Sequence, residues 1–354
     1  MELSELCGLK SCEDSIKESG LPVYIYGMGN GGEKVLKWCS DRDIKAEGVF
    51  ASDDFVRGQS FMGYTVQKLS DIEREVGEFT VLCAFGTELP EIMAHIDEIE
   101  RRHPLYAPDV PVAGDESFTK AGLAERFADV QRVYDALADE QSKRVFTGLS
   151  AYKITGRLGY LREIFTDEPK PSPLLGLSSE EIVCDLGAYN GDTVLGLLKA
   201  TGGCKKVYAV EPEKRNFQKC VKNCTDVSEA EFYNAAAWSH DGVLDFEGGS
   251  GRQAKLETGG SGKIAARSLD SILSGRKCTY IKYDVEGADI PALEGSFETI
   301  RQYHPKLYCS LYHRCFDYID IPLYLMEHFE GYRYFMRQDR YYPAWETYLV
   351  AVDE

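Results

Sequence analysis

The feature that most constrains the fold is a pattern that occurs twice: an apolar stretch, a glycine-rich turn and then helical spacing. The first copy is PVYIYGMGNGGEKVLKWCSD at residues 22–41, and the second is EIVCDLGAYNGDT at residues 181–193. A strand that passes through glycines directly into a helix is typical of open parallel α/β sheets. Strand-like and helix-like segments continue to alternate after both copies. We therefore predict two doubly wound, Rossmann-like α/β domains.

The chain divides into three predicted parts. We expect a Rossmann-like, nucleotide-binding-type domain at residues 1–110, a helical connector at 111–175 and a second α/β domain at 176–354. A length of 354 residues is enough for two domains. Residues 115–165 carry apolar side chains at helical spacing. The stretch EPKPSPL at 168–174 contains three prolines and is typical of a linker.

Composition excludes several classes of function. The formal net charge of −18 and the lack of a dense Lys/Arg block disfavour nucleic acid as a partner. The 11 cysteines show no CxxC spacing, so we expect reduced thiols and no metal site. No apolar run approaches the ~20 residues of a membrane span, and the N-terminus does not resemble a signal peptide. We therefore expect a cytoplasmic protein that does not bind membranes.

The first glycine turn matches a dinucleotide-binding pattern. Gly27, Gly29 and Gly32 form G-x-G-x-x-G between a strand and a helix, and Asp53 follows Gly32 at the spacing of a ribose-binding acid. The same pattern also fits a nucleotide-type fold that has lost its ligand. The stretch GVFASDD…GYTV loosely resembles the small Rossmann-like domains that precede sugar-modifying acyltransferases, which implies a nucleotide or nucleotide-sugar site. A second nucleotide in this domain is therefore one expectation, and an empty fold is the other.

The second glycine turn carries acids in place of phosphate ligands. Asp185 ends a buried strand, and Gly187 and Gly191 flank the turn that follows. A carboxylate here repels a pyrophosphate but accepts a proton from an ammonium or hydroxyl group. Glu211 ends the next strand, KVYAVEP, where a doubly wound sheet holds a ribose diol. The pair favours a nucleoside that carries a cationic amino acid.

Residues around these acids complete the expected nucleoside site. Asp192 and Thr193 begin a helix with N-cap character. The small residues at 234–237, which include Ala235 and Ala236, would let an adenine lie flat against the backbone.

Acidic side chains also end a later strand, in TYIKYDVEG. Lys282, Asp284 and Glu286 alternate, so one strand face would carry all three charges. Such a face is costly unless it meets a ligand or the charges meet each other. We expect an active-site rim with Asp284 near the reacting groups and Lys282 paired with it; a solvated strand end is the alternative. His313, at the end of the strand KLYCSLYH, is either a substrate contact or base, or a packing residue.

These motifs together resemble the FkbM family of methyltransferases. DLGAYNGDT, VYAVEP, SLDSI at 268–272, IKYDVEGADIPALEG and LYH occur in the family's order over about residues 180–352. The resemblance implies a class I methyltransferase fold with S-adenosylmethionine as the methyl donor. It also implies that Asp284 and Glu286 belong to the family's K-x-D-x-E-G element. The residues that we expect at the donor are Asp185, Gly187, Ala188, Asn190, Gly191, Asp192, Thr193, Glu211, Pro212, Ala235, Ala236 and Glu286.

The resemblance implies O-methylation of a hydroxyl on a sugar or secondary-metabolite-like small molecule. The expected catalytic residues are Lys282, Asp284 and His313, and either Asp284 or His313 would accept the proton. Two other classes of function remain open. One is an oxidoreductase that binds a dinucleotide at the N-terminal G-x-G-x-x-G, and the other is a non-catalytic module that senses a nucleotide.

Overall fold

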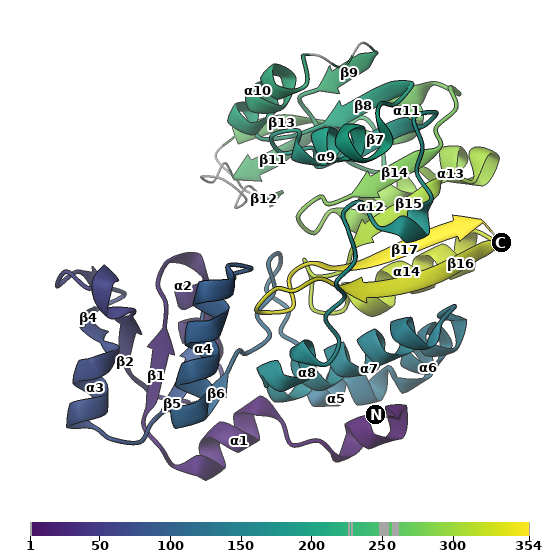
Figure 1. The fold of residues 1–354 in the computed structure, drawn as a ribbon. Coiled ribbons are helices and arrows are strands. Elements are labelled where there is room, and N and C mark those ends of the chain that lie inside the picture. The colour runs from purple at the N-terminus through teal and green to yellow at the C-terminus, as the bar shows by residue number, and fades with distance from the viewer. Residues whose placement is uncertain (1, 226, 228, 248–254, 257–261, 354) are drawn as a thin grey trace.

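A computed structural model describes residues 2–225, 227, 229–247, 255–256 and 262–353. It contains two α/β units with a group of helices packed against both of them (Figure 1). Helices flank mostly parallel sheets in each unit, which confirms the predicted Rossmann-like class.

The N-terminal unit is built on a six-stranded sheet in the order β3-β4-β2-β1-β5-β6. All its strand pairs are parallel except β3–β4. Its strands are β1 (Val23–Tyr26), β2 (Ala46–Ala51), β3 (Ser60–Phe61), β4 (Tyr64–Lys68), β5 (Thr80–Cys83) and β6 (Leu105–Tyr106). Its helices are η1 (Leu3–Gly8), α1 (Cys12–Ser19), α2 (Gly29–Ser40), η2 (Asp53–Phe55), α3 (Leu69–Glu75) and α4 (Pro90–Arg102).

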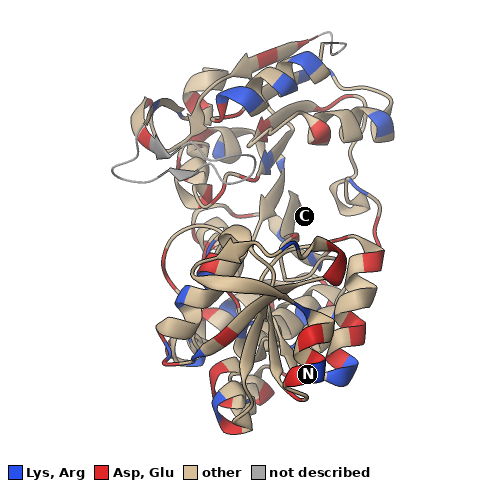
Figure 2. Ribbon diagram, turned by 90° about the vertical axis from the view of Figure 1, so that its left-hand side faces the viewer, with Lys and Arg blue, Asp and Glu red and all other residues tan. Residues whose placement is uncertain are grey.

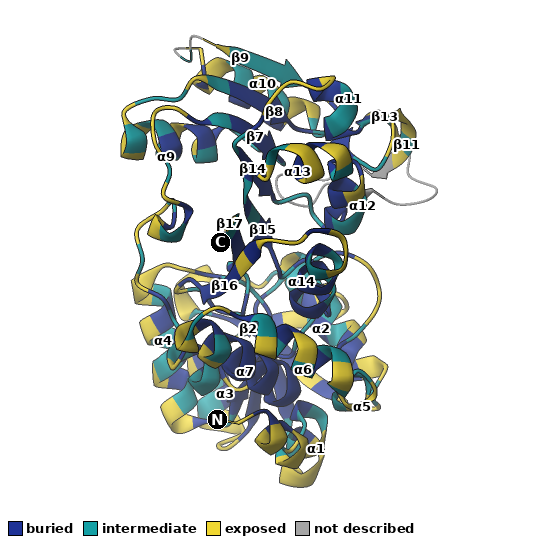
Figure 3. Cartoon of the chain, turned by 90° about the vertical axis from the view of Figure 1, so that its right-hand side faces the viewer, coloured by how far each residue is buried: buried dark blue, intermediate teal, exposed yellow. Residues whose placement is uncertain are grey.

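The middle of the chain is helical, as the apolar spacing predicts. Its helices are α5 (Lys120–Glu125), α6 (Phe127–Ala136), α7 (Glu140–Thr155), α8 (Leu158–Arg162) and η3 (Pro173–Leu175). Every residue of α7 from Val145 onward is buried, and Figure 3 shows this helix in dark blue below β16. One apolar core runs through α7 into both sheets, so this segment is a shared core element and not only a connector.

The C-terminal unit has a seven-stranded sheet in the order β16-β17-β15-β14-β7-β8-β9. Its strands are β7 (Ile182–Leu186), β8 (Lys206–Val210), β9 (Ala230–Tyr233), β14 (Tyr280–Tyr283), β15 (Lys306–Ser310), β16 (Tyr332–Gln338) and β17 (Thr347–Asp353). The neighbouring strands β15, β14, β7, β8 and β9 are parallel, and β16 and β17 form an antiparallel hairpin. The helices are α9 (Asp192–Thr201), α10 (Lys214–Asn223), α11 (Leu269–Leu273), α12 (Asp289–Glu294), α13 (Phe297–Tyr303) and α14 (Asp317–His328).

A second, four-stranded sheet follows β9, and the sequence patterns did not predict it. Its order is β10-β13-β11-β12. The strands are β10 (Ala236–Ala237), β11 (Gly242–Glu247), β12 (Lys255–Leu256) and β13 (Gly262–Arg267).

Acidic and basic residues are mixed along the helices of both units (Figure 2). All eleven cysteines are free thiols, in agreement with the sequence-based expectation. Among the described residues, no helix has both the length and the apolar character needed to cross a bilayer.

A short backbone ladder joins the two units beside the sheet edge. Thr87 and Tyr342 exchange two hydrogen bonds, of 2.7 Å from the Thr87 amide and 2.9 Å from the Tyr342 amide. Gly86 packs beneath the turn between β16 and β17. A Cβ atom at Gly86 would lie 2.6 Å from the Trp345 ring and 2.8 Å from the Tyr341 ring. Glycine is therefore the residue that fits at position 86 in this contact between the two units.

We expect Gly86→Ala to lower the free energy of unfolding by about 1–3 kcal/mol, because the added methyl overpacks this contact. Urea unfolding measures the change. Gly159→Ala in α8 is the matched control, since nothing lies within 4 Å of a Cβ there. That variant should be neutral or slightly stabilising. Equal effects of the two substitutions would contradict the proposed contact.

Candidate functional site

A cavity of about 580 Å³ opens beside the carboxyl ends of the parallel strands of the C-terminal unit. Its wall includes residues that follow β7, β8 and β14. The order in which strands are added to the sheet reverses at β7, which has β8 on one side and β14 on the other. Ligands of doubly wound sheets bind at such a switch point.

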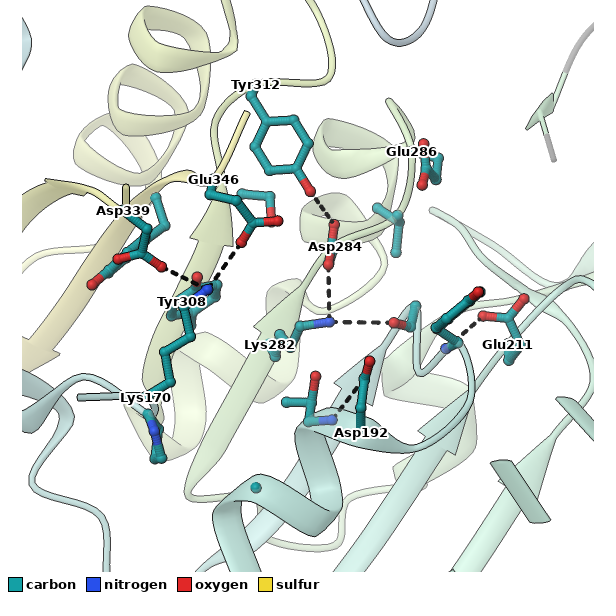
Figure 4. Close-up of a pocket in the computed structure, with 18 of the residues that line it drawn as sticks. Lys170, Asp192, Glu211, Lys282, Asp284, Glu286, Tyr308, Tyr312, Asp339 and Glu346 are labelled. Carbon is teal, nitrogen blue, oxygen red and sulfur yellow. Dashed lines mark hydrogen bonds and ion pairs between the residues drawn. The ribbon is translucent and has the colours of Figure 1, made fainter. Parts of the chain in front are cut away.

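A buried chain of charges forms the floor of the cavity (Figure 4). The parallel register places Lys282 opposite Asp185. The Lys282 Nζ lies 3.3 Å from Asp185 Oδ1 and 3.2 Å from Asp284 Oδ2, and it donates a hydrogen bond of 3.2 Å to the Gly187 carbonyl. Asp185 is fully buried, while Lys282 and Asp284 line the cavity. Asp185 therefore holds Lys282 from behind and does not line the wall.

The three charged groups shift one another's pKa values. Burial raises the pKa of Asp185 to about 6, although Lys282 opposes the shift. Burial lowers the pKa of Lys282, but Asp185 and Asp284 outweigh it and raise that pKa above its ordinary value. Burial likewise acts to raise the pKa of Asp284, but Lys282 and His313 lower it well below the usual range. Near neutral pH, Asp284 is a carboxylate and Lys282 an ammonium group.

A second acid marks the other end of the floor. Glu211 follows β8, is 6% exposed and accepts hydrogen bonds from the backbone amides of Tyr189 and Glu213, each 2.8 Å long. Burial nevertheless raises the pKa of Glu211 to about 7. The glycine loop is tied to the same strand, because the amides of Gly187 and Ala188 both donate to the Val210 carbonyl. Gly187 has φ +85°, and a Cβ there would overlap the Asp284 carbonyl, so only glycine fits.

Comparison with known proteins identifies this unit. The family model of the methyltransferase FkbM domain matches residues 185–334. This segment is an FkbM methyltransferase domain. A crystal structure of the methyltransferase FkbM from Methylobacillus flagellatus KT shares the fold of both units, with a TM-score of 0.74 at 20% identity over 99% of this chain and 95% of that one.

Other similarities are partial. An rRNA methylase from Streptococcus thermophilus gives a TM-score of 0.35 at 15% identity, over 50% of this chain and 89% of its own. No curated protein matches the chain significantly.

His313 lies beneath the FkbM domain's charged floor and is fully buried. Its Nε2 is 3.1 Å from Asp284 Oδ1, and its Nδ1 is 2.9 Å from Asp289 Oδ2. Burial lowers the pKa of His313, but the carboxylates, Asp289 foremost, outweigh it and raise the pKa well above 6.5. The ring of a protonated His313 has no free lone pair. In addition, His313 does not line the cavity. This geometry does not fit the expectation that His313 contacts substrate or acts as a base; it positions Asp284 instead.

The protonation of His313 also matters for metal binding, because this residue belongs to a cluster of possible metal ligands. Asp289, His313 and Asp317 each offer one ligand atom, and these atoms lie within 4.8 Å of one another. A metal would have to displace a proton from His313 to bind here. In this structure the residues form a buried ion network, in which His313 Nδ1 lies 2.9 Å from Asp289 Oδ2. Burial also raises the pKa of Asp317 to about 7, which reduces the negative charge there.

We expect Asp289→Asn to lower the pKa of His313 and to reduce stability by about 1–3 kcal/mol at about pH 6. A raised folded-state pKa gives stability that is fully present below the unfolded pKa and is lost as pH rises through the folded one. The difference from wild type should therefore be largest below pH 6.5 and shrink as the pH rises above that value. Urea unfolding at several pH values tests this, and a difference that grows with pH would contradict it.

The FkbM domain brings most of the predicted residues to the cavity, but others lie behind it. The predicted residues that line the wall are Gly187, Asp192, Thr193, Glu211, Pro212, Ala236, Lys282, Asp284 and Glu286. Those outside the wall are Asp185, Ala188, Asn190, Gly191, Ala235 and His313. Asn190 supports the loop, since its Oδ1 accepts a 3.0 Å hydrogen bond from the Asp192 amide.

Two local predictions need correction. The N-cap of α9 is Gly191, with φ +86°, so Asp192 is the first helical residue and not the cap. β14 ends at Tyr283, and Glu286 adopts φ +53° in the turn that follows. Glu286 therefore does not share a strand face with Lys282, although it still reaches the cavity wall.

The predicted second nucleotide site finds no support. A Cβ at Gly27 would lie 2.6 Å from the Phe85 ring and one at Gly32 would lie 2.9 Å from the Phe61 ring, whereas nothing lies within 4 Å of one at Gly29. Aromatic rings therefore pack against two of the three glycines. The Asp53 carboxylate accepts a 2.6 Å hydrogen bond from the Ser70 hydroxyl, which lowers its pKa. The acid is thus engaged with α3 within its own unit.

Sequence reasoning missed one wall of the cavity. It is formed by residues 86–89 after β5, residues 170–172 of the proline-rich segment, and Asp339, Tyr341 and Glu346 between β16 and β17. The three prolines at 168–174 are typical of a linker, yet residues 170–172 of this segment line the site. The sequence feature of this wall that can be seen without a structure is the Arg- and Tyr-rich composition of the loop between β16 and β17.

Proposed function

We propose that the protein transfers a methyl group from S-adenosylmethionine to a hydroxyl of a sugar or secondary-metabolite-like molecule. The observation that carries this proposal is the pair of acids, Glu211 and Asp284, at the ends of β8 and β14 on either side of the β7 glycine loop. Both lie in one cavity (Figure 4).

The residues present fit this donor. Glu211 would hold the ribose hydroxyls, since it is buried at the cavity wall and hydrogen bonds to a charged group are strong. Gly187 and Ala236 are small wall residues that leave room for a flat base. The bound donor would supply an electrophilic methyl group on a sulfonium. The carboxylates near it favour a cationic ligand over a pyrophosphate.

Asp284 is the residue that we propose to orient the acceptor hydroxyl. Lys282 and His313 hold its carboxylate from two sides, at 3.2 Å and 3.1 Å, and the Tyr312 hydroxyl donates to it at 3.3 Å. Its low pKa makes it a weak base toward a neutral alcohol. An oxygen that has gained a methyl group is a much stronger acid than an alcohol, so Asp284 can accept the proton as the new bond forms. Positioning supplies the remaining rate enhancement.

Calorimetry with S-adenosylhomocysteine and, separately, NAD tests the donor assignment. We expect binding of S-adenosylhomocysteine, and at about 100 times its Kd a stabilisation of roughly 2.7 kcal/mol. Binding of NAD without S-adenosylhomocysteine would overturn the proposal. Transfer of a labelled methyl group to a panel of hydroxyl compounds tests catalysis. Donor binding without transfer to any of them would favour a nucleotide-sensing module.

A further inference from the structure

A lysine of the N-terminal unit holds the backbone of the segment between β6 and α5. Lys34 lies on α2, the helix of the first glycine motif. Its Nζ donates hydrogen bonds to the backbone carbonyls of Pro111, at 2.5 Å, and of Val112, at 2.7 Å. Hydrogen bonds from a charged donor are stronger than those between neutral groups. Two such bonds from one ammonium group therefore fix the 111–113 segment against α2.

The 111–113 segment also contacts the FkbM domain below its charged floor. The Ala113 amide donates a 2.8 Å hydrogen bond to the His313 carbonyl. A Cβ at Gly287 would lie 2.5 Å from the Ala113 Cβ, so Ala113 packs directly on the turn that follows Asp284. The buried Ala113 therefore contacts both the turn after Asp284 and the residue that pairs with the Asp284 carboxylate.

The two loops that Ala113 contacts are joined to each other. The Arg314 Nε donates a 2.9 Å hydrogen bond to the Gly287 carbonyl, and His313 Nε2 lies 3.1 Å from Asp284 Oδ1. Close-packed protein interiors transmit small displacements. A shift of Ala113 would therefore move His313 and the turn after Asp284 together. A misplacement of about 1 Å at reacting groups can lower a rate by as much as roughly 100-fold.

We propose that Lys34 is a positioning residue for methyl transfer. It fixes the 111–113 segment, and this segment holds His313 and Asp284 in the arrangement that orients the acceptor hydroxyl. This inference rests on the proposed function for the role of Asp284. It gives the N-terminal unit a part in the reaction that needs no nucleotide at its glycine turn.

Lys34→Met tests the proposal, because it removes the ammonium group and keeps a side chain of similar length. We expect kcat to fall roughly tenfold. The KM of S-adenosylmethionine and the Kd of S-adenosylhomocysteine should stay within about twofold, because Glu211 lies at the other end of the floor. Lys37→Met, an exposed substitution on the same helix, should leave all three constants unchanged. An unchanged kcat in Lys34→Met, or a donor KM that rises as kcat falls, would overturn the proposal.

Two further variants separate positioning from stability. Val35 is fully buried on the same helix, so Val35→Ala weakens the packing of the N-terminal unit but keeps both Lys34 hydrogen bonds. It should leave kcat unchanged, and a loss of kcat equal to that of Lys34→Met would overturn the proposal. Lys34→Gln keeps one polar donor and should lose less of kcat than Lys34→Met. It takes over the comparison with Val35→Ala if Lys34→Met does not fold.

Hydrogen exchange of the full chain, measured by mass spectrometry, gives a result that does not depend on methyl transfer. In the folded Lys34→Met variant, we expect peptides that cover residues 111–115 and 284–289 to exchange at least about threefold faster than in wild type. Unchanged exchange in both peptides would overturn the proposal. Faster exchange in both, without methylation of any acceptor by the wild type, would contradict the proposed function and leave the link from Lys34 to the Asp284 turn in place.

Discussion

Lys282→Met is expected to lower the free energy of unfolding by about 3–5 kcal/mol, the cost of breaking a buried ion pair. The substitution removes the cation between Asp185 and Asp284 and leaves the fully buried Asp185 carboxylate without its 3.3 Å partner. Methionine fills a similar volume, so the loss reports charge and not a cavity. Urea unfolding at neutral pH measures it, and near-ultraviolet circular dichroism checks that the variant is folded.

The double variant Asp185→Asn/Lys282→Met separates charge from packing. If the uncompensated carboxylate causes the loss, the double variant should be clearly more stable than Lys282→Met alone. Lys199→Ala, at an exposed position on α9, should change stability by less than about 0.5 kcal/mol. A double variant that is no more stable than Lys282→Met would show that Lys282 matters through packing.

Glu211→Ala should weaken binding of S-adenosylhomocysteine by roughly 100-fold. Loss of two hydrogen bonds to a charged group, at about 1.5–3 kcal/mol each, gives at least this change. The carboxylate also accepts the Tyr189 and Glu213 amides, so the variant loosens the loop as well as removing the ribose contact. Calorimetry measures the affinity of the wild type and the variant at the same pH.

Two further variants serve as comparisons for Glu211→Ala. Glu211→Gln keeps an acceptor oxygen and should lose less affinity than Glu211→Ala. Glu229→Ala, at an exposed position before β9, should bind as wild type does. Unchanged affinity in Glu211→Ala would remove Glu211 from the donor site and with it the main support for the methyl-transfer proposal.

The sequence predicted the parts of the site that depend on local pattern. Strand, glycine turn and helix follow one another in 182–201, and acids at strand ends are visible without a structure. Glu211 and Asp284 reach the cavity because parallel strands end at one edge of a sheet. The pairing of Lys282 with Asp284 also followed from spacing.

Features that depend on tertiary packing were not predictable in this way. Asp185 has the same pattern as Glu211, but the β7–β14 register places Lys282 over it and removes it from the wall. His313 also follows a strand end, but it is fully buried and its Nδ1 pairs with Asp289 on α12. The first glycine turn has the right spacing, but the Phe85 and Phe61 rings pack against two of its three glycines. Spacing alone carries no information about such distant partners.

The enclosure of α7 by both units has a consequence for how this chain can be divided. Buried side chains line the helix from Val145 to Thr155, and a shared core extends from it to either side. A fragment beginning at residue 176 would lose this support and would expose the face of β16 on which the Ser142 hydroxyl accepts the Met336 amide. The C-terminal unit therefore cannot be joined to a different N-terminal domain without damage. Such an exchange would disturb both the packing of its sheet and the cavity wall that residues 86–89 form.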